Sequence, residues 1–454
     1  MSTASFHALG CRLNQTEAAV LAGSFRDNGY DVVEWGSPAD VVVINTCSVT
    51  ERGEAACRSA IRQALRRKPD AFVVVTGCYA QVGLEALRAI DGIDMIVGTE
   101  YKHKFPAFIG EPRKLEEPVV LHSNLIDDAD FEVPGTGLYH TTRANLKVQD
   151  GCDFFCSFCI IPFTRGRERS RQLPDLMREA RQLAADGFKE IVLTGVNIGR
   201  YRHDGTSFDG MVGQLETLDG IDRIRITSIE PTTIESALVE RMARSSKLCN
   251  YFHIPIQSAD GAVLEQMNRH YSPEEYRDFI EYITDVVPDV GLGTDVIVGF
   301  PGETDALFDK TYRFLESLPF AYLHVFSYSK RYGTKASRLD EPVGSQTIKE
   351  RSQALRALST SKRQAFARRY LGSRVEVLFE QQDDNGLWTG LTDNYLRVGV
   401  VSSEPLRNEI RSVTIRELAG EMAIGAISAR TDDPLPSTLR GMEASPRSEP
   451  RRLQ

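Results

Sequence analysis

Long hydrophobic runs are scarce in this chain of 454 residues. No stretch approaches the roughly 20 apolar residues of a membrane-spanning helix, and the start, MSTASFHALG, lacks the basic and apolar regions of a secretory signal peptide. We therefore expect a cytoplasmic protein with no membrane partner. The chain also lacks an excess of positive charge, because its formal net charge is −9. This charge argues mildly against nucleic acid as a partner.

Eight cysteines are present, and in a cytoplasmic protein, where thiols stay reduced, they indicate metal binding or catalysis before disulfides. Cys152, Cys156 and Cys159, hereafter the core triad, have the spacing CxxxCxxC. Three thiolates can hold a 4Fe-4S cluster with one iron left open. A zinc knuckle, which needs four ligands, or a chance cluster remains the alternative on spacing alone. Cys57 and Cys249 fit no such pattern and are expected to pack in cores.

Residues 1–112 are predicted to form a domain built on a parallel sheet, because short apolar runs alternate with helical segments. The expected strands are Phe6–Leu9, Val41–Thr46, Phe72–Thr76 and Met95–Val97. Cys11, Cys47 and Cys78, hereafter the auxiliary triad, follow the first three of these strands. The carboxyl ends of parallel strands share one edge of a sheet. We therefore expect a second three-thiolate cluster at that edge.

Residues 138–371 are predicted to form an incomplete (β/α)6 barrel that ends in a long charged helix. The expected strands are Ala144–Gln149, Glu190–Thr194, Arg223–Ser228, Tyr251–Ile256, Gly291–Val298 and Tyr322–Tyr328. The core triad follows the first strand directly, and polar or glycine residues follow several others. Such barrels carry their chemistry on the loops after the strands. The candidates at this mouth are Gly195, Asn197, Glu230, Gln257, Ser258 and Asp295.

Residues 372–430 are predicted to form a small antiparallel β-barrel similar to the oligonucleotide-binding type. The expected strands are Val375–Glu380, Leu387–Thr392, Tyr395–Val401 and Glu409–Arg416. Between residues 373 and 420 the sequence has five Lys and Arg but eight Asp and Glu. Attraction to phosphate alone would therefore not make this barrel bind RNA. Residues 113–137 are expected to be a linker, and residues 431–454 a disordered tail.

These motifs resemble the radical S-adenosylmethionine (SAM) methylthiotransferase family. A CxxxCxxC motif after the first strand of a partial barrel is similar to the radical SAM superfamily. The sequences GCRLN, NTCSVT and TGCYAQ around the auxiliary triad resemble the amino-terminal domain of the methylthiotransferases. The segments WTG at 388–390 and NY at 394–395 resemble their RNA-binding TRAM domain. The resemblance covers nearly the whole chain apart from the tail.

The resemblance implies two 4Fe-4S clusters and SAM as cofactors. The core triad would hold the cluster whose open iron binds SAM, and one electron from an external reductant of the flavodoxin or ferredoxin type would cleave SAM to a deoxyadenosyl radical. The auxiliary triad would hold the cluster that is the sulfur source. Phe158 would pack on the adenine of SAM, and Gly195 would allow close approach of its methionine part. Asn197, Glu230, Gln257, Ser258 and Asp295 would supply polar contacts, with hydrogen bonds at the barrel rim as the alternative for each.

The motif details are most similar to the subgroup that modifies N6-threonylcarbamoyladenosine in tRNA. Arg12 follows the first cysteine, where the subgroup acting on a ribosomal protein typically has proline. The implied reaction adds a methylthio group to carbon 2 of the base at position 37, in the anticodon stem-loop, by a monomeric enzyme. The alternatives are isopentenyladenosine in tRNA, a ribosomal-protein aspartate, or a non-catalytic iron–sulfur RNA-binding protein. Arg165, Arg167, Arg169 and Arg171 alternate beside the mouth and are candidates for phosphate contacts.

Overall fold

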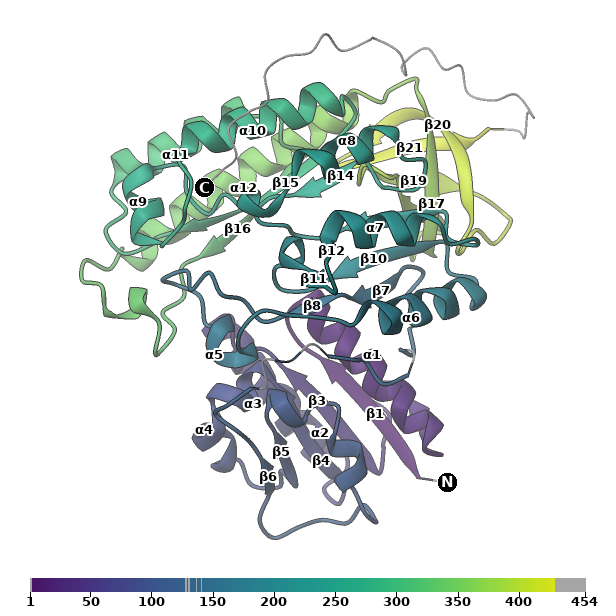
Figure 1. The fold of residues 1–454 in the computed structure, drawn as a ribbon, viewed down its shortest axis with the longest axis vertical. Helices are drawn as coiled ribbons and strands as arrows, with labels where there is room; N and C mark the ends of the chain where they lie inside the picture. Colours follow the sequence, from purple (N-terminus) through teal and green to yellow (C-terminus); the bar gives the residue numbers. More distant parts are fainter. Residues whose placement is uncertain (1, 127–128, 130, 136, 140, 429–454) are drawn as a thin grey trace.

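The computed structural model describes residues 2–126, 129, 131–135, 137–139 and 141–428. The amino-terminal domain lies at one end of the molecule, the partial barrel in the middle, and the C-terminal β-barrel against the far side of the partial barrel (Figure 1). The tail predicted at 431–454 lies outside the described residues. Among the described residues, no helix is both long and apolar enough to cross a membrane.

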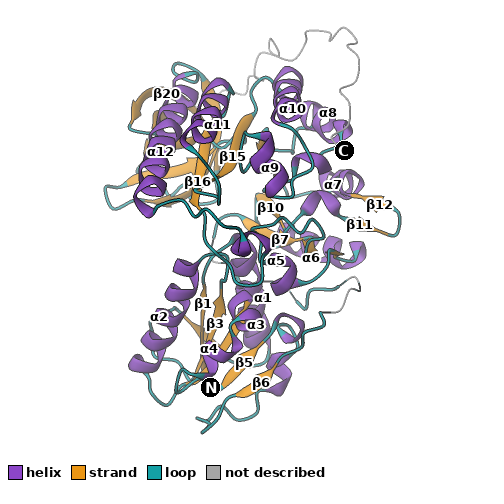
Figure 2. Cartoon of the chain, turned by 90° about the vertical axis from the view of Figure 1, so that its left-hand side faces the viewer, coloured by secondary structure: helices purple, strands orange, loops and turns teal. Residues whose placement is uncertain are grey.

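The amino-terminal domain is a six-stranded parallel sheet with helices on both faces (Figure 2). Its strands, in spatial order, are β2 (Asp31–Val33), β1 (Thr3–Ala8), β3 (Val41–Thr46), β4 (Phe72–Gly77), β5 (Met95–Val97) and β6 (Val119–Leu121). The main helices are α1 (Arg12–Asp27) and α2 (Glu51–Arg67), followed by the short α3 (Cys78–Val82) and α4 (Leu84–Arg88). Apolar side chains fill both faces of the central strands, which is why these strands are nearly continuous valine runs.

The predicted linker contributes a strand to this sheet. In β6, Val119 pairs with Met95 of β5 in parallel register. The edge strand β2 was also not predicted, because only three residues of it pair with β1. Both strands depend on the neighbour that they pair with, rather than on an apolar pattern of their own.

The central domain confirms the six predicted strands, arranged as two parallel three-stranded sheets. One sheet has the order β13 (Arg223–Ile226), β10 (Glu190–Thr194), β7 (Ala144–Lys147), and the other the order β14 (Tyr251–His253), β15 (Gly291–Val298), β16 (Tyr322–Ser327). Isolated bridges, such as Ser228 with His253, join them into one incomplete barrel. The helices outside it are α6 (Leu173–Ala185), α7 (Phe208–Glu216), α8 (Ser236–Arg244), α9 (Gly261–Gln266), α10 (Pro273–Val286) and α11 (Asp305–Ser317). The predicted charged helix is α12 (Ser345–Arg368), which packs on β16.

The C-terminal domain is a closed barrel of five strands, so the predicted small barrel is confirmed. In order around the barrel, the strands are β17 (Arg374–Gln382), β18 (Leu387–Leu391), β19 (Arg397–Val401), β21 (Met422–Ile427) and β20 (Ile410–Ala419). Strand β21 was not predicted, and it closes the barrel by pairing with β19 in parallel and with β20 antiparallel. The prediction of a purely antiparallel barrel was therefore wrong at one strand pair, because β19 and β21 are parallel.

The C-terminal barrel is docked on the amino ends of the partial-barrel strands. Arg225 of β13 forms an ion pair with Glu190 at 2.6 Å and also donates hydrogen bonds to the main-chain oxygens of Thr392 and Asp393. The ring of Tyr395 stacks on Tyr251 of β14 with 4.6 Å between the ring centres. These contacts leave the carboxyl ends of the strands, which carry the core triad, facing the amino-terminal domain.

Candidate active site between two cysteine triads

The structure brings the three thiols of the auxiliary triad together. Cys11 caps α1 after β1, Cys47 follows β3, and Cys78 opens α3 after β4, and these three strands are neighbours in the sheet. Burial raises the pKa of the Cys47 thiol to about 12, and the other two thiols are close enough for their charges to raise it further. The turn before Cys11 requires glycine, because Gly10 has φ +88° and a Cβ there would overlap the Cys47 sulfur.

The core triad lies on the loop between β8 (Gln149–Asp150) and α5 (Ile161–Arg165). The Cys159 amide donates to the Cys156 carbonyl at 2.9 Å. The Asn268 side chain donates to the carbonyls of Phe154 and Phe155 at 3.0 and 3.2 Å, which fixes the loop between the first two cysteines. Burial raises the pKa of the Cys152 thiol to about 12, and the neighbouring Cys156 adds to the effect.

Some predicted mouth residues are engaged in contacts with the protein itself. Glu230 forms an ion pair with Arg269, whose Nη1 also lies 3.4 Å from the Cys156 sulfur. The Ser258 hydroxyl accepts a hydrogen bond from the Asp260 amide at 3.3 Å within a turn. Gly195 packs so closely on the Gln149 carbonyl that a Cβ would be crowded. The contacts of these residues with SAM stay predictions.

The remaining mouth residues lie in two places, Gln257 and Phe158 beside β15 and Asn197 on the loop after β10. Gln257 has φ +66°, which is unusual for a residue other than glycine. Its main-chain N–H donates to the main-chain carbonyl of Asp295 at 2.9 Å. The Phe158 ring packs against a cluster that includes Phe300 and Met267. Asn197 is buried, and neither polar atom of its side chain has a hydrogen-bond partner among the described residues. Asn197 lies close enough to the Cys152 thiol to lower the pKa of that thiol.

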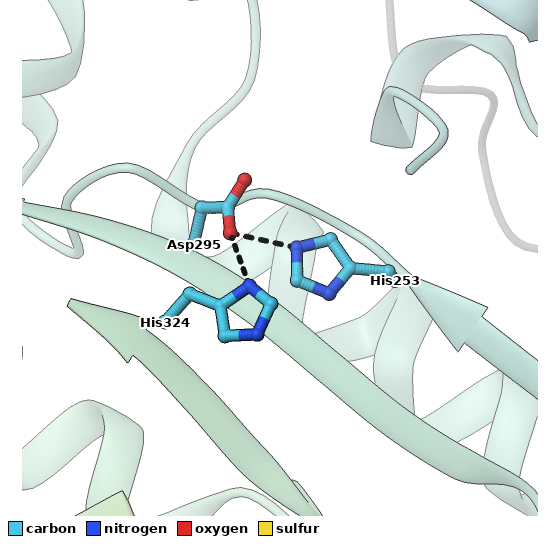
Figure 3. Close-up of side chains that lie close together, drawn as sticks. All are labelled: His253, Asp295 and His324. Atoms are coloured by element: carbon cyan, nitrogen blue, oxygen red, sulfur yellow. Dashed lines mark hydrogen bonds and ion pairs between the residues drawn. The ribbon is translucent and has the colours of Figure 1, made fainter. Parts of the chain in front are cut away.

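Two histidines that sequence analysis missed converge on Asp295 (Figure 3). The Oδ1 atom of Asp295 lies 2.8 Å from Nε2 of His253 and 3.3 Å from Nδ1 of His324. Burial opposes ionisation of Asp295, but the electrostatic interactions and hydrogen bonds with the two imidazoles outweigh it and hold the pKa of its carboxyl below the ordinary value. His324 of β16 pairs with Asp295 of β15. Only a correct prediction of the register between these two strands could have placed His324 at the site.

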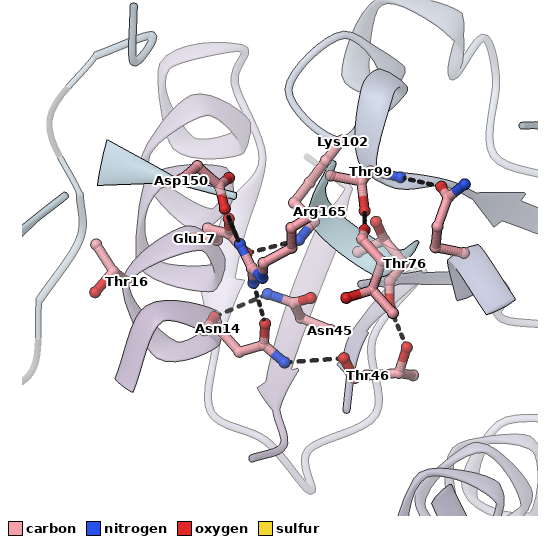
Figure 4. Close-up of polar contacts among 12 residues, drawn as sticks. Asn14, Thr16, Glu17, Asn45, Thr46, Thr76, Thr99, Lys102, Asp150 and Arg165 are labelled. Atoms are coloured by element: carbon pink, nitrogen blue, oxygen red, sulfur yellow. Dashed lines mark hydrogen bonds and ion pairs between the residues drawn. The ribbon is translucent and has the colours of Figure 1, made fainter. Parts of the chain in front are cut away.

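A buried charge network crosses the boundary between the amino-terminal domain and the partial barrel, close in sequence to cysteines of both triads (Figure 4). Arg165, only 1% exposed, donates to Glu17 of α1 and to Asp150 of β8, each at 2.9 Å, and to Asn14 at 2.7 Å. Asn14 in turn donates to the main-chain oxygen of Thr46, directly before Cys47, at 2.8 Å. Burial opposes ionisation of Glu17, yet Arg165 and two lysines hold the pKa of its carboxyl well below the ordinary value.

The predicted row of phosphate-binding arginines is therefore wrong for most of its members. Arg165 belongs to the buried network, and Arg171 is fully buried, with its guanidinium bound to Asp175 and Glu179. Arg169 is largely buried and faces Asp150 at 3.6 Å. Arg167 alone of the four is exposed.

Known proteins resemble both halves of this site. The family model described as "Radical SAM superfamily" matches residues 146–315, and the model "Uncharacterized protein family UPF0004" matches residues 3–98. The threonylcarbamoyladenosine tRNA methylthiotransferase MtaB of Bacillus subtilis is 39% identical over 91% of this chain and 94% of its own. The protein of the same name from Aquifex aeolicus is 38% identical over 87% and 95%. A tRNA-2-methylthio-N(6)-dimethylallyladenosine synthase of Acetivibrio thermocellus is 33% identical over 85% and 82%.

Among solved structures, the radical SAM methyltransferase TsrM of Kitasatospora setae, with cobalamin and a 4Fe-4S cluster bound, has a TM-score of 0.52. It shares 14% identity over 74% of this chain and 77% of its own, a likeness of fold alone. The partial barrel with its CxxxCxxC loop defines a radical SAM enzyme. Because relatives at 33–39% identity cover nearly its whole length, the chain belongs to the radical SAM methylthiotransferase family.

The residues present fit the SAM and 4Fe-4S clusters that this family implies. Thiols whose pKa is raised by burial, as at Cys47 and Cys152, stay protonated at neutral pH unless a cation stabilises the thiolate. Iron supplies that charge, and each triad offers three sulfur ligands. The unpartnered amide of Asn197 and the unpartnered hydroxyl of Ser157 lie buried beside or within the core triad loop. Such groups are costly unless a polar ligand satisfies them.

Proposed function

We propose that this enzyme adds a methylthio group to carbon 2 of N6-threonylcarbamoyladenosine at position 37 of tRNA. The observation that carries the proposal is the pair of cysteine triads, with one buried network close in sequence to both, in a chain that aligns over nearly its full length with relatives named for this reaction. Relatives named for dimethylallyladenosine also align, at 32–35% identity, and they define the alternative substrate.

In this proposal the core triad holds the SAM-binding cluster, and the auxiliary triad holds the second cluster. When bound, these groups supply the radical and the sulfur. The chain's own residues bind the core cluster and shield it from water. Arg269 places a positive charge beside Cys156, and Phe158 covers the site with an apolar ring. The loop after β16 closes the boundary to the amino-terminal domain, because Arg331 binds Glu54 at 2.8 Å and the Ser48 carbonyl at 3.0 Å.

The partners follow from the same proposal. The C-terminal barrel acts as a TRAM-like domain that contacts the anticodon stem-loop, where single-stranded bases splay out readily. Because this barrel carries more acidic than basic residues, its shape and its aromatic side chains contribute to RNA binding alongside the attraction of its basic side chains for phosphate. The enzyme works as a cytoplasmic monomer and receives single electrons from a flavodoxin- or ferredoxin-type protein.

Deletion of the gene is expected to remove 2-methylthio-N6-threonylcarbamoyladenosine from total tRNA and to leave the unmethylthiolated nucleoside in its place. Nucleoside mass spectrometry measures both species, together with the isopentenyladenosine derivatives as an internal control that should not change. An unchanged pool of the methylthio threonylcarbamoyl nucleoside would contradict the proposal. Loss of the isopentenyl derivative instead would favour the alternative substrate.

The variant Gly10→Ala is expected to lose the auxiliary cluster, so that about eight irons per chain fall to about four. A Cβ at this position meets the Cys47 sulfur in a backbone conformation that alanine rarely adopts. Iron analysis after anaerobic reconstitution measures the loss. Gly29→Ala is the matched control, because Gly29 has φ +85° but no atom within 4 Å of the added Cβ. Equal iron in the two variants would show that the Gly10 turn does not shape the cluster site.

A further inference from the structure

Most cations near the two triads are already neutralised by carboxylates. The pairs are Arg165 with Glu17, Arg269 with Glu230, and Arg331 with Glu54. Arg12 differs, because it forms no ion pair with any described residue, although it is half-buried. A half-buried guanidinium without a counter-charge is expected to bind an anion.

Arg12 lies between the auxiliary triad and the interior of the partial barrel. It directly follows Cys11 and opens α1, which packs against β7. Its Nη1 atom lies 3.4 Å from Oδ1 of Asn145 on β7. Its charge also reaches the opposite sheet: burial raises the pKa of Tyr251 on β14, and the Arg12 guanidinium lowers it in part. Arg12 is thus a cation that directly follows the auxiliary triad and lies against β7, the edge strand of the incomplete barrel opposite to the edge strand β16.

A chain of hydrogen bonds leads from Tyr251 of β14 to His324 of β16. The hydroxyls of Tyr251 and Tyr322 are hydrogen-bonded, and the Tyr322 hydroxyl lies 2.9 Å from Nδ1 of His253. Nε2 of His253 and Nδ1 of His324 both point at Asp295, as Figure 3 shows. An ionised carboxylate only accepts, so both ring nitrogens carry hydrogens. In neutral His324, Nε2 is then an acceptor, and it has no hydrogen-bond partner among the described residues.

Solvent and ligands can reach His324. Its side chain is 50% exposed, and β16, which carries it, is the edge strand of the incomplete barrel. Beside this edge lies an open hollow of about 560 Å³ whose lining includes His324, Phe326 and Arg363. Phe326 is an exposed aromatic ring two residues along the same face of the strand. The edge therefore offers a polar acceptor and a flat apolar surface side by side.

We propose that Arg12 and His324 form the subsite for the N6 side chain of the target nucleoside, with Arg12 binding its carboxylate and His324 accepting a hydrogen bond from its hydroxyl. The inference rests on the proposed function, because the threonylcarbamoyl group carries both a carboxylate and a hydroxyl. Asp295 acts as a positioning residue, since it holds the His324 ring with Nε2 outward. An isopentenyl group has neither polar feature and would leave Arg12 without a partner.

Equilibrium binding of three anticodon stem-loops to the anaerobically reconstituted enzyme, without reductant, tests this subsite. The stem-loops carry threonylcarbamoyladenosine, the same nucleoside with its carboxylate converted to an amide, and the glycylcarbamoyl analogue, which lacks the hydroxyl. We expect the wild type to prefer the acid over the amide by about tenfold or more, as a charge-assisted hydrogen bond warrants. The preference for threonyl over glycyl is expected to be about two- to tenfold.

Two variants should each abolish one preference and keep the other. Arg12→Gln should bind the acid and the amide alike, and Arg12→Lys should restore part of the difference. His324→Phe should bind the threonyl and glycyl forms alike and still prefer the acid. Arg62→Gln, which removes an exposed arginine on α2, is the matched control and should leave both ratios unchanged.

Other results would overturn the inference in distinguishable ways. A wild type that binds the acid and the amide equally would remove the role of Arg12, while the proposed reaction could still stand on the nucleoside analysis. A wild type that prefers an isopentenyladenosine stem-loop would overturn the proposed function itself. Stoichiometric zinc bound by His253, Asp295 and His324, whose ligand atoms lie within 4.8 Å of one another, would remove the role of His324.

Discussion

Replacement of Glu17 by glutamine is expected to lower the free energy of unfolding by about 3–5 kcal/mol, the usual cost of breaking a buried ion pair from one side. Glu17 is 1% exposed. Its carboxylate accepts from Arg165 at 2.9 Å, from Lys147 at 2.8 Å and from Lys102 at 2.6 Å. A glutamine keeps the shape but removes the charge, which leaves the cations of the network with Asp150 as their main counter-charge.

The same substitution should change how stability depends on pH. The folded protein holds the pKa of Glu17 well below its ordinary value of 4.5. The stabilisation is therefore fully present above pH 4.5 and is lost as the pH falls through the lowered, folded-state pKa. We expect the difference in stability between the wild type and Glu17→Gln to be constant near neutral pH and to shrink in acid.

Urea unfolding of the anaerobically prepared protein, followed by circular dichroism, measures this difference. The matched control is Arg244→Gln, which breaks an exposed pair with Glu240 and should cost less than about 1 kcal/mol. Glu17→Gln should also lower the yield of methylthiolated product per SAM cleaved, because α1 carries Cys11 at its start and the network fixes α1 against the core triad loop. A cost no larger than that of the control would mean that the network does not hold the domains together.

The sequence predicted the parallel sheets because their central strands are buried on both faces. Val41–Thr46 and Phe72–Gly77 are apolar runs that need no knowledge of their neighbours to be recognised. Strands β6 and β21 are different. The run Val119–Leu121 is short and follows acidic residues and a proline, and it becomes a strand only because the edge of β5 is there to pair with it.

The site divides in the same way. The triads were predictable, since spacing and strand ends are local features of the chain. The burial of Arg165 in a charge network could not be predicted, because its main partner, Glu17, is 148 residues away in sequence. An arginine in a basic run looks like a phosphate contact until the buried carboxylates that face it are known. His324 was missed because one residue of register decides whether it faces Asp295 or the opposite side of the sheet.

Replacement of the core triad by alanine is expected to abolish SAM cleavage and to reduce the iron content from about eight to about four per chain. The two triads lie on different elements: the core triad on the loop after β8, and the auxiliary triad at the ends of β1, β3 and β4. Each cluster should therefore survive the loss of the other. The measurements are iron per chain after reconstitution and 5′-deoxyadenosine formed with dithionite and SAM.

The control for this variant is Cys249→Ala, which removes a buried thiol that belongs to neither triad. Cys249 packs in the core between the partial barrel and the C-terminal barrel, so its loss should cost stability but no iron and no deoxyadenosine. Retention of all the iron in the triple variant would refute the assignment of the core triad. Loss of all the iron would instead show that the auxiliary site depends on the core cluster.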